Sequence, residues 1–191
     1  YKRQALGSET MVGDQGGPNS YPGDYFNGDA PQKYKIKGSF GHPVPVVDGR
    51  TQSSGGKAKG VVLQKEFTNE KDVFSIDYTS AYSTPNLDKL IRTFVYDRQG
   101  KGNFTVGDEF TAKTPIRFET AITTRADWKV LDDTHLLLAT DSEQMIVAID
   151  ASGKVAFTSE TIEVNSPAYT RIGIALKNQS KDCLLYTSDA A

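Results

Sequence analysis

Short segments of alternating polar and apolar residues, separated by turn residues, recur along most of the chain and restrict its fold more than any other feature. In residues 72–78, for example, Phe74, Ile76 and Tyr78 alternate with more polar neighbours. A period of two is typical of a strand with one buried face. No window shows sustained helical periodicity, and only residues 86–90 hint at a helical turn. The pattern predicts an all-β fold with little helix.

The expected strands follow one another at short, regular intervals. They cover residues 34–37, 44–47, 59–67, 72–78, 90–96, 104–110, 116–122, 128–131, 136–140, 145–149 and 169–176, and a short strand within residues 5–14 ends in a Gly-Asp turn. The chain has 17 Gly, nine Tyr and nine Phe, a composition that favours strands and turns. Many short strands between turns predict one domain built as an antiparallel β-sandwich or as stacked sheets.

The two ends of the sequence fit one DNA string read in opposite directions. Residues 1–4 can be back-translated as TAT AAG AGA CAG, and the reverse complement of this string is CTGTCTCTTATA. If the codon of Asp182 is GAC, the same string runs from the last base of that codon through the codons of Cys183 and the residues after it. This string resembles a transposase adapter used in library preparation. We therefore predict that residues 1–4 and 183–191 are translated adapter and that residues 5–182 are a metagenomic fragment truncated at both ends. The lone cysteine, Cys183, would then be artefactual, and no disulfide is expected.

Charge and hydropathy give no support for nucleic acid as a partner or for a membrane span. The formal net charge is -2, which gives no electrostatic basis for binding nucleic acid. No apolar run approaches the length needed to span a membrane. An acidic polysaccharide remains compatible with this charge, because a local basic groove can exist on a mildly negative protein.

Residues 13–52 carry the most specific pattern. Asp14 stands in a Gly-Asp turn, a loop rich in Tyr and Phe follows, and His42 precedes Val44–Pro45–Val46–Val47–Asp48–Gly49. Downstream come a Ser-Ile-Asp-Tyr-Thr-Ser-Ala-Tyr segment at 75–82 and an Arg92 strand followed by Val106-Gly107-Asp108. In order and spacing, over about residues 11–128, these motifs resemble the heparinase II/III family of polysaccharide lyases. The resemblance implies the β-sandwich part of such an enzyme, of the lyase supersandwich type.

The resemblance also implies a metal site. Asp14 and His42 would be two ligands of a divalent ion, and a third ligand would lie upstream of residue 5. Carboxylate and imidazole donors suit Zn²⁺ best, with Ca²⁺ or Mn²⁺ as alternatives. From residue type alone, an Asp in a turn and a single His more often serve structural roles.

Other polar and aromatic residues allow two interpretations each. Tyr21 and Tyr25 could stack on sugar rings, or could pack the loop onto the sheet. Lys33, Lys35, Lys37 and Arg50 could meet uronate carboxylates, or could form a solvated strand face. Arg92 with Asp108 is expected to be a structural cross-strand pair, and Tyr78 and Tyr82 to be buried with satisfied hydrogen bonds. His135 receives no role.

The sequence thus predicts part of a lyase that cleaves uronate-containing polysaccharide, such as glycosaminoglycan or alginate-like chains, by β-elimination. Its partners would be the acidic polysaccharide and a missing N-terminal α/α-toroid domain with most catalytic groups, so the fragment alone is expected to be inactive. A polymeric substrate indicates a periplasmic or extracellular bacterial protein. The alternatives are a non-catalytic carbohydrate-binding module and a structural sandwich without a ligand.

Overall fold

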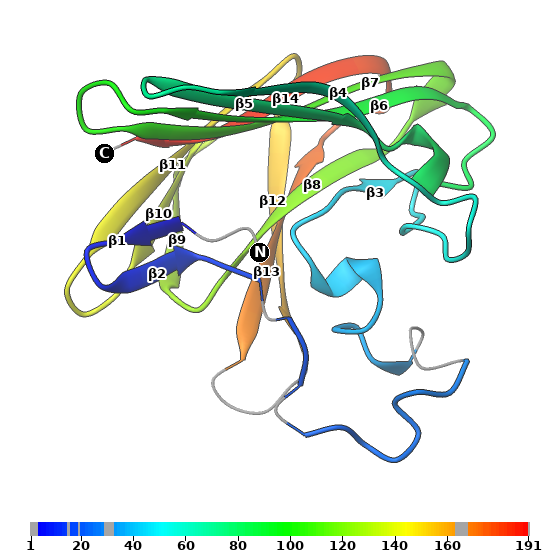
Figure 1. The fold of residues 1–191 in the computed structure, drawn as a ribbon, viewed down its shortest axis with the longest axis horizontal. Coiled ribbons are helices and arrows are strands. Elements are labelled where there is room, and N and C mark those ends of the chain that lie inside the picture. Colours follow the sequence, from blue (N-terminus) through cyan, green and yellow to red (C-terminus); the bar gives the residue numbers. More distant parts are fainter. Residues whose placement is uncertain (1–3, 15, 19, 29–32, 163–167, 191) are drawn as a thin grey trace.

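A computed structural model describes residues 4–14, 16–18, 20–28, 33–162 and 168–190, and this part of the chain forms two stacked antiparallel sheets and a hairpin (Figure 1). The eight-stranded sheet has the order β4 (Val61–Phe67), β5 (Lys71–Asp77), β6 (Leu87–Asp97), β7 (Asn103–Ile116), β14 (Ser180–Ala190), β11 (Gln144–Ala151), β10 (His135–Ala139) and β9 (Asp127–Asp132). The four-stranded sheet has the order β12 (Val155–Ile162), β13 (Tyr169–Leu176), β8 (Phe118–Thr124) and β3 (Val46–Val47). The hairpin consists of β1 (Gln4–Leu6) and β2 (Glu9–Val12). The predicted all-β sandwich is confirmed.

The core lies between the two sheets, because the central strands turn apolar positions toward the opposite layer. Phe110 of β7 and Phe118 of β8 are fully buried, with ring centroids 4.8 Å apart. Leu90 and Leu185 from the larger sheet and Ile172 from the smaller one are also completely buried. Burying such side chains contributes about 1.5–3 kcal/mol each, which makes this layer the main source of stability.

Three local expectations were wrong. Residues 5–14 hold a hairpin of β1 and β2 and not one strand. Residues 34–37 form a turn and not a strand, because the segment folds back on itself through a hydrogen bond from the Lys37 N–H to the Tyr34 carbonyl (3.0 Å). Residues 87–90 belong to β6, and the helical turns stand elsewhere, at η1 (Ser39–Gly41) and η2 (Thr79–Ala81). For residues 87–90, pairing with β7 overrides the local preference.

The residues predicted to be adapter sequence include most of β14. In the described part, β14 lies between β7 and β11, with Cys183 and Leu185 buried and Leu184 40 % exposed. This alternation lets the segment fill a central position in the sheet, since a strand position depends on the residue pattern and not on the origin of the codons. The adapter origin stays a prediction.

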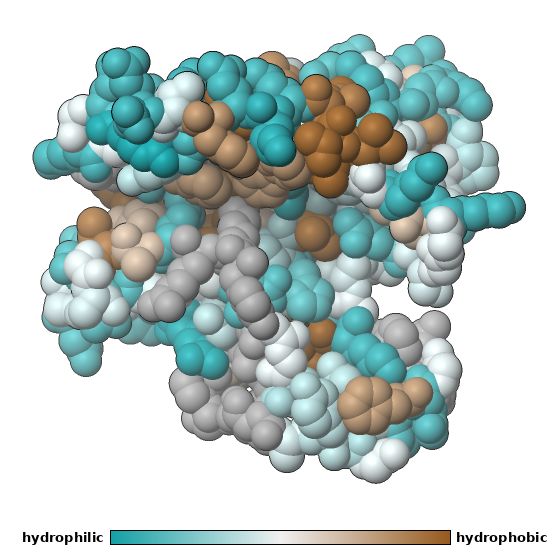
Figure 2. Space-filling view, in the orientation of Figure 1, coloured by the Kyte–Doolittle hydropathy of each residue, from teal (hydrophilic) through white to brown (hydrophobic). Residues whose placement is uncertain are grey.

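The edge of the larger sheet is apolar on its surface. The side chains of Val61, Val62, Leu63 and Phe67 on β4 are each more than half exposed. Figure 2 shows apolar surface on this upper layer, above the more polar lower part of the molecule. Within the described residues, no helix has the length and hydropathy needed to span a bilayer.

Candidate functional site

Asp14 is held against the four-stranded sheet by the residue before it. The Gly13 N–H donates to the Thr123 carbonyl of β8 at 3.0 Å, and the Thr123 hydroxyl donates back to the Gly13 carbonyl. Asp14 then closes a small turn, in which its Oδ1 accepts a hydrogen bond from the Gly16 N–H at 2.9 Å. This side-chain-to-backbone turn is common for Asp and fixes the direction of the carboxylate.

His42 stands directly after η1 and before Pro43. Its backbone is extended (φ -117°, ψ 161°), as expected for a residue preceding proline. The His42 N–H donates to the Ser39 carbonyl at 3.2 Å, which anchors the residue to η1. The imidazole is thereby directed toward Asp14, although 28 positions separate the two residues in sequence.

The two side chains are in direct contact. His42 Nδ1 lies 2.8 Å from Asp14 Oδ1 and 3.0 Å from Oδ2, while Nε2 lies 3.0 Å from the Ile36 carbonyl oxygen. The Ile36 carbonyl can only accept a hydrogen bond, so Nε2 carries a proton. In a neutral imidazole the lone pair of Nδ1 would then face the carboxylate. At this separation the contact requires a proton shared between the two groups.

The pKa shifts follow from this contact. The hydrogen bond with Asp14 raises the pKa of His42 above its usual value, against the opposing effect of burial. Burial works against ionisation of Asp14, but the hydrogen bonds from His42 and from the Gly16 N–H outweigh it and lower the pKa of Asp14. Both shifts favour the ion pair in the absence of a metal.

The donor set fits a metal ion in part. A carboxylate and an imidazole are standard ligands of Zn²⁺, and a metal-bound His usually donates its second N–H to a backbone carbonyl, as His42 does to Ile36. Among the residues that the structure describes, no third His, Cys, Asp or Glu completes a group of three. The predicted pair is thus brought together, and the metal itself stays a prediction.

The aromatic loop separates into exposed and buried rings. Tyr21 is 57 % exposed and Phe26 74 %, whereas Tyr25 is only 7 % exposed and packs with Ile36 and Ile162. The Tyr21 and Tyr25 centroids are 5.0 Å apart, at an interplanar angle of 67°. The buried ring of Tyr25 therefore supports the exposed ring of Tyr21.

The lysines that could have formed a basic strand face are instead tied to this loop region. Lys33 pairs with Asp24, and Lys35 pairs with Glu160 of β12. Lys37 donates to the Tyr25 carbonyl, with its ammonium 5.1 Å from the centroid of the Tyr25 ring. These contacts hold the loop onto the smaller sheet.

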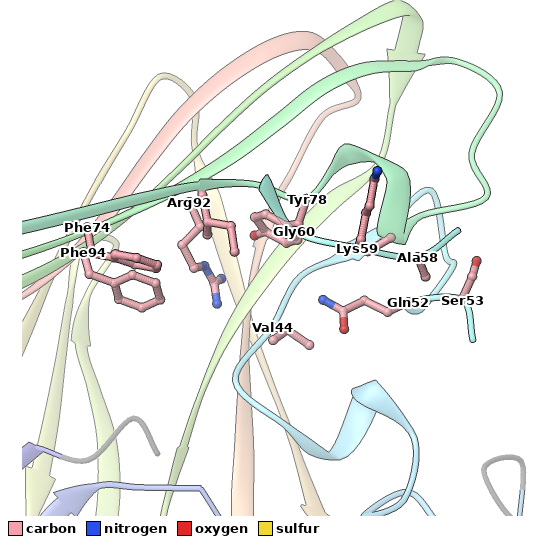
Figure 3. A pocket seen from close by; sticks show the side chains of 12 residues that line it. Val44, Gln52, Ser53, Ala58, Lys59, Gly60, Phe74, Tyr78, Arg92 and Phe94 are labelled. Carbon is pink, nitrogen blue, oxygen red and sulfur yellow. The ribbon is translucent and has the colours of Figure 1, made fainter. Parts of the chain in front are cut away.

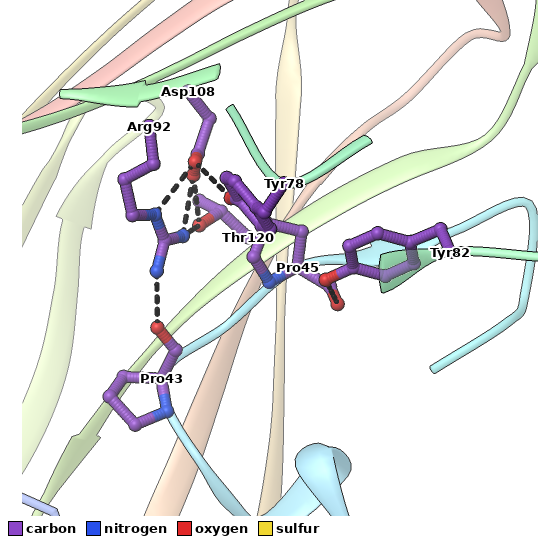
Figure 4. A network of polar contacts seen from close by, with 7 residues as sticks. All are labelled: Pro43, Pro45, Tyr78, Tyr82, Arg92, Asp108 and Thr120. Carbon is purple, nitrogen blue, oxygen red and sulfur yellow. Dashed lines mark hydrogen bonds and ion pairs between the residues drawn. The ribbon is translucent and has the colours of Figure 1, made fainter. Parts of the chain in front are cut away.

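A buried polar network contacts the segment that follows His42 (Figure 4). Arg92 Nε and Nη2 donate to the two oxygens of Asp108, each at 2.7 Å, and the Tyr78 hydroxyl donates to Asp108 Oδ1 at 2.9 Å. Arg92 Nη1 donates to the Pro43 carbonyl at 2.6 Å, and the Tyr82 hydroxyl donates to the Pro45 carbonyl at 2.7 Å. The predicted Arg92–Asp108 pair is confirmed, and so is the burial of Tyr78 and Tyr82.

A pocket of about 400 Å³ opens beside the same segment (Figure 3). Val44 and Arg92 form part of its wall, Phe74 and Phe94 line its apolar side, and the Gln52 side chain points into it. Val44, two positions after His42, thus brings the same segment to the wall of the pocket.

Comparison with known proteins gives a match in structure and not in sequence. No family model matches the chain, and no curated protein matches it. Solved structures cover nearly all of it: a heparinase III described as the BT4657 gene product (TM-score 0.72, 11 % identity, 95 % of the chain) and a second heparinase III (TM-score 0.70, 18 % identity, 95 %). The chain shares its fold with part of heparinase III. The heparan sulfate lyase HepC from Pedobacter heparinus is also similar (TM-score 0.69, 14 % identity, 96 %).

The match covers a minor part of the heparinase III structures. The chain spans only 28 % of the two heparinase III chains and 29 % of HepC. At these identities the likeness shows the heparinase III fold alone. It agrees with the architecture that the motifs of residues 11–128 predicted.

Sequence reasoning missed Arg171. This residue of β13 is 2 % exposed, donates from Nη1 to Glu119 of β8 at 2.5 Å, and has its guanidinium carbon 4.4 Å from the centroid of the Phe40 ring. Phe40 belongs to η1, so Arg171 helps to fix the turn that leads to His42. No local pattern signals this role, because Arg171 stands in an ordinary strand and its partners come from distant segments.

Proposed function

We propose that the chain is the β-sandwich part of a bacterial polysaccharide lyase of the heparinase II/III type, and that the parent enzyme cleaves uronate-containing polysaccharide by β-elimination. The heparinase III fold over 95 % of the chain, together with the contact between Asp14 and His42, supports this proposal. The substrate is polymeric, so the parent enzyme would act in the periplasm or outside the cell.

In this reaction a base removes the proton at C5 of the uronate, the C4–O bond breaks, and a C4=C5 double bond forms. An acid gives a proton to the leaving oxygen, and a further group neutralises the carboxylate of the sugar. We assign the base and the acid to the part of the parent enzyme outside this chain. The sandwich would shape one side of the substrate groove, where the exposed ring of Tyr21 would stack on a sugar with Tyr25 behind it.

The Asp14–His42 pair would bind a divalent metal with a structural role. Zn²⁺ is the first candidate because it accepts both oxygen and nitrogen donors, and Ca²⁺ and Mn²⁺ are the alternatives. The third ligand would come from residues upstream of this chain. Asp14 and His42 would hold the metal, and the metal would connect the turn after β2 to the segment after η1.

A metal titration monitored on the histidine rings tests the metal site. The chain has two histidines, His42 and His135, and His135 contacts Asp132 on the β9–β10 turn. With isotope-labelled histidine, added Zn²⁺ is expected to move the His42 ring signals, and Asp14→Asn is expected to abolish the effect. His135 contacts the Asp132 carboxylate in the same way, so only a His42 response that Asp14→Asn abolishes counts as binding at this site. Because the third ligand would lie upstream, the decisive titration uses the parent protein, where unchanged His42 signals in excess Zn²⁺, Ca²⁺ and Mn²⁺ would remove the metal from the proposal.

An ultraviolet assay for unsaturated sugar tests the lyase. The parent protein, recovered with its upstream coding sequence, is expected to release unsaturated product from glycosaminoglycan or alginate-like polymers, and the 191-residue chain alone to release none. Product from the chain alone would show that the catalytic groups have been assigned to the wrong part. Binding of glycan by the parent without any product would favour the carbohydrate-binding module.

A further inference from the structure

We infer that Tyr82 and Arg92 are positioning residues for His42, because they fix the segment that carries the imidazole from the opposite sheet. The inference deepens the proposed function, since it names the groups that set the geometry of the proposed metal site. It rests on contacts that exist whether or not a metal is bound.

The segment from His42 to Pro45 has little structure of its own. Pro43 and Pro45 have no N–H groups and cannot donate to a sheet. The Val44 N–H donates to the His42 carbonyl at 2.8 Å, which closes a tight turn around Pro43. Regular ladder pairing begins only at Val46, opposite Glu119 of β8. The orientation of His42 therefore depends on contacts from outside the segment.

Two side chains of the eight-stranded layer supply those contacts. Arg92 of β6 donates to the Pro43 carbonyl at 2.6 Å, and Tyr82, directly after η2, donates to the Pro45 carbonyl at 2.7 Å (Figure 4). Both donors are buried, with Arg92 4 % and Tyr82 5 % exposed. A carbonyl that loses a buried donor pays a desolvation cost, so each contact resists movement of the segment.

The partner of His42 is fixed from the other layer. Asp14 follows Gly13, which is bound to Thr123 of β8 in the four-stranded sheet. The carboxylate is thus fixed to the smaller sheet. His42 is held on one side by the Ile36 and Ser39 carbonyls. On the other side its segment is held from the larger layer by Tyr82 and Arg92. The separation between Nδ1 and the carboxylate oxygens consequently depends on these contacts and on the packing of the sheets.

A matched pair of substitutions tests the inference without unfolding the network. Tyr82→Phe removes the contact to Pro45, whereas Tyr78→Phe removes a buried hydroxyl of the same cluster that contacts Asp108 and not the His42 segment. In the metal-free 191-residue chain with labelled histidine, Tyr82→Phe is expected to shift the His42 ring signals and to leave those of His135 in place. Tyr78→Phe is expected to leave both unchanged, although both variants lose stability. Where the wild-type protein binds Zn²⁺, the Tyr82→Phe variant is further expected to bind Zn²⁺ about 10-fold more weakly.

The outcomes separate the inference from the proposed function. His42 signals that stay at their wild-type positions in Tyr82→Phe, or that move equally in Tyr78→Phe, would overturn the positioning role. Wild-type His42 signals that do not change when metal is added would overturn the metal site alone. The positioning role would stay testable, because Tyr82→Phe and Tyr78→Phe are compared without metal.

Discussion

Arg92 and Asp108 stand directly opposite each other on β6 and β7 and form a two-pronged ion pair inside the sandwich, with both N···O distances at 2.7 Å. Burial alone would drive such charges toward their neutral forms. The charge and hydrogen bonds of Arg92, with further hydrogen bonds from Thr120 and Tyr78, outweigh burial and lower the pKa of Asp108. The pair is therefore ionised and internally satisfied.

Breaking this pair on one side is expected to be costly. Asp108→Asn leaves the Arg92 guanidinium buried without a counter-charge, which costs about 3–5 kcal/mol in the free energy of unfolding. Urea denaturation followed by circular dichroism measures the loss. The neighbouring change Glu109→Gln, on the partly exposed side of β7, is the control and is expected to cost less than about 1 kcal/mol. Equal losses in the two variants would contradict the role of the pair.

The same pair predicts the acid side of the stability profile. Since the pKa of Asp108 is lower in the folded state, its contribution is complete above the unfolded value of about 3.9 and is lost as the pH falls through the folded value. The stability gap between wild type and Asp108→Asn is thus expected to be constant above about pH 5 and to narrow at lower pH. Urea midpoints measured from neutral to strongly acidic pH test this. A gap that widens on acidification would mean that the carboxyl is protonated in the folded protein.

The two tyrosines of the aromatic loop are expected to respond differently to truncation. Tyr25→Ala removes a buried ring between Ile36 and Ile162 and is expected to cost about 3 kcal/mol. Tyr21→Ala removes an exposed ring and is expected to cost about 1 kcal/mol or less. Thermal unfolding compares the variants. A larger loss in Tyr21→Ala would show that the exposed ring carries the packing.

Adjacent leucines of β14 test the register of that strand. Leu185 is completely buried opposite Asp108, and Leu184 is 40 % exposed opposite Glu109. Leu185→Ala is expected to cost about 2–5 kcal/mol and Leu184→Ala less than about 1 kcal/mol. Chemical denaturation of the two variants gives the comparison. Similar losses would place β14 in another register or outside the sheet, because a slip by one residue exchanges the two faces.

Much of the fold follows from local pattern. The alternation in residues 72–78 and 104–110 predicted β5 and the central part of β7, and the cross-strand pairing of Arg92 with Asp108 followed from their places in neighbouring strands. Residues 34–37 alternate in the same way, yet they form a turn, because Lys35 and Lys37 are held by Glu160 and by the Tyr25 carbonyl. Alternation shows that a segment can be a strand, and only available partners make it one.

The candidate site was also predicted only in part from the sequence. The sequence by itself determined that the chain is an all-β protein and that Asp14 and His42 are candidate ligands. Only the tertiary structure decided that their side chains touch, that Arg171 lies beneath η1, and that Tyr82 and Arg92 reach Pro45 and Pro43. The physical reason is range: strand periodicity is fixed by neighbours along the backbone, whereas these contacts join residues that meet only when the two sheets pack.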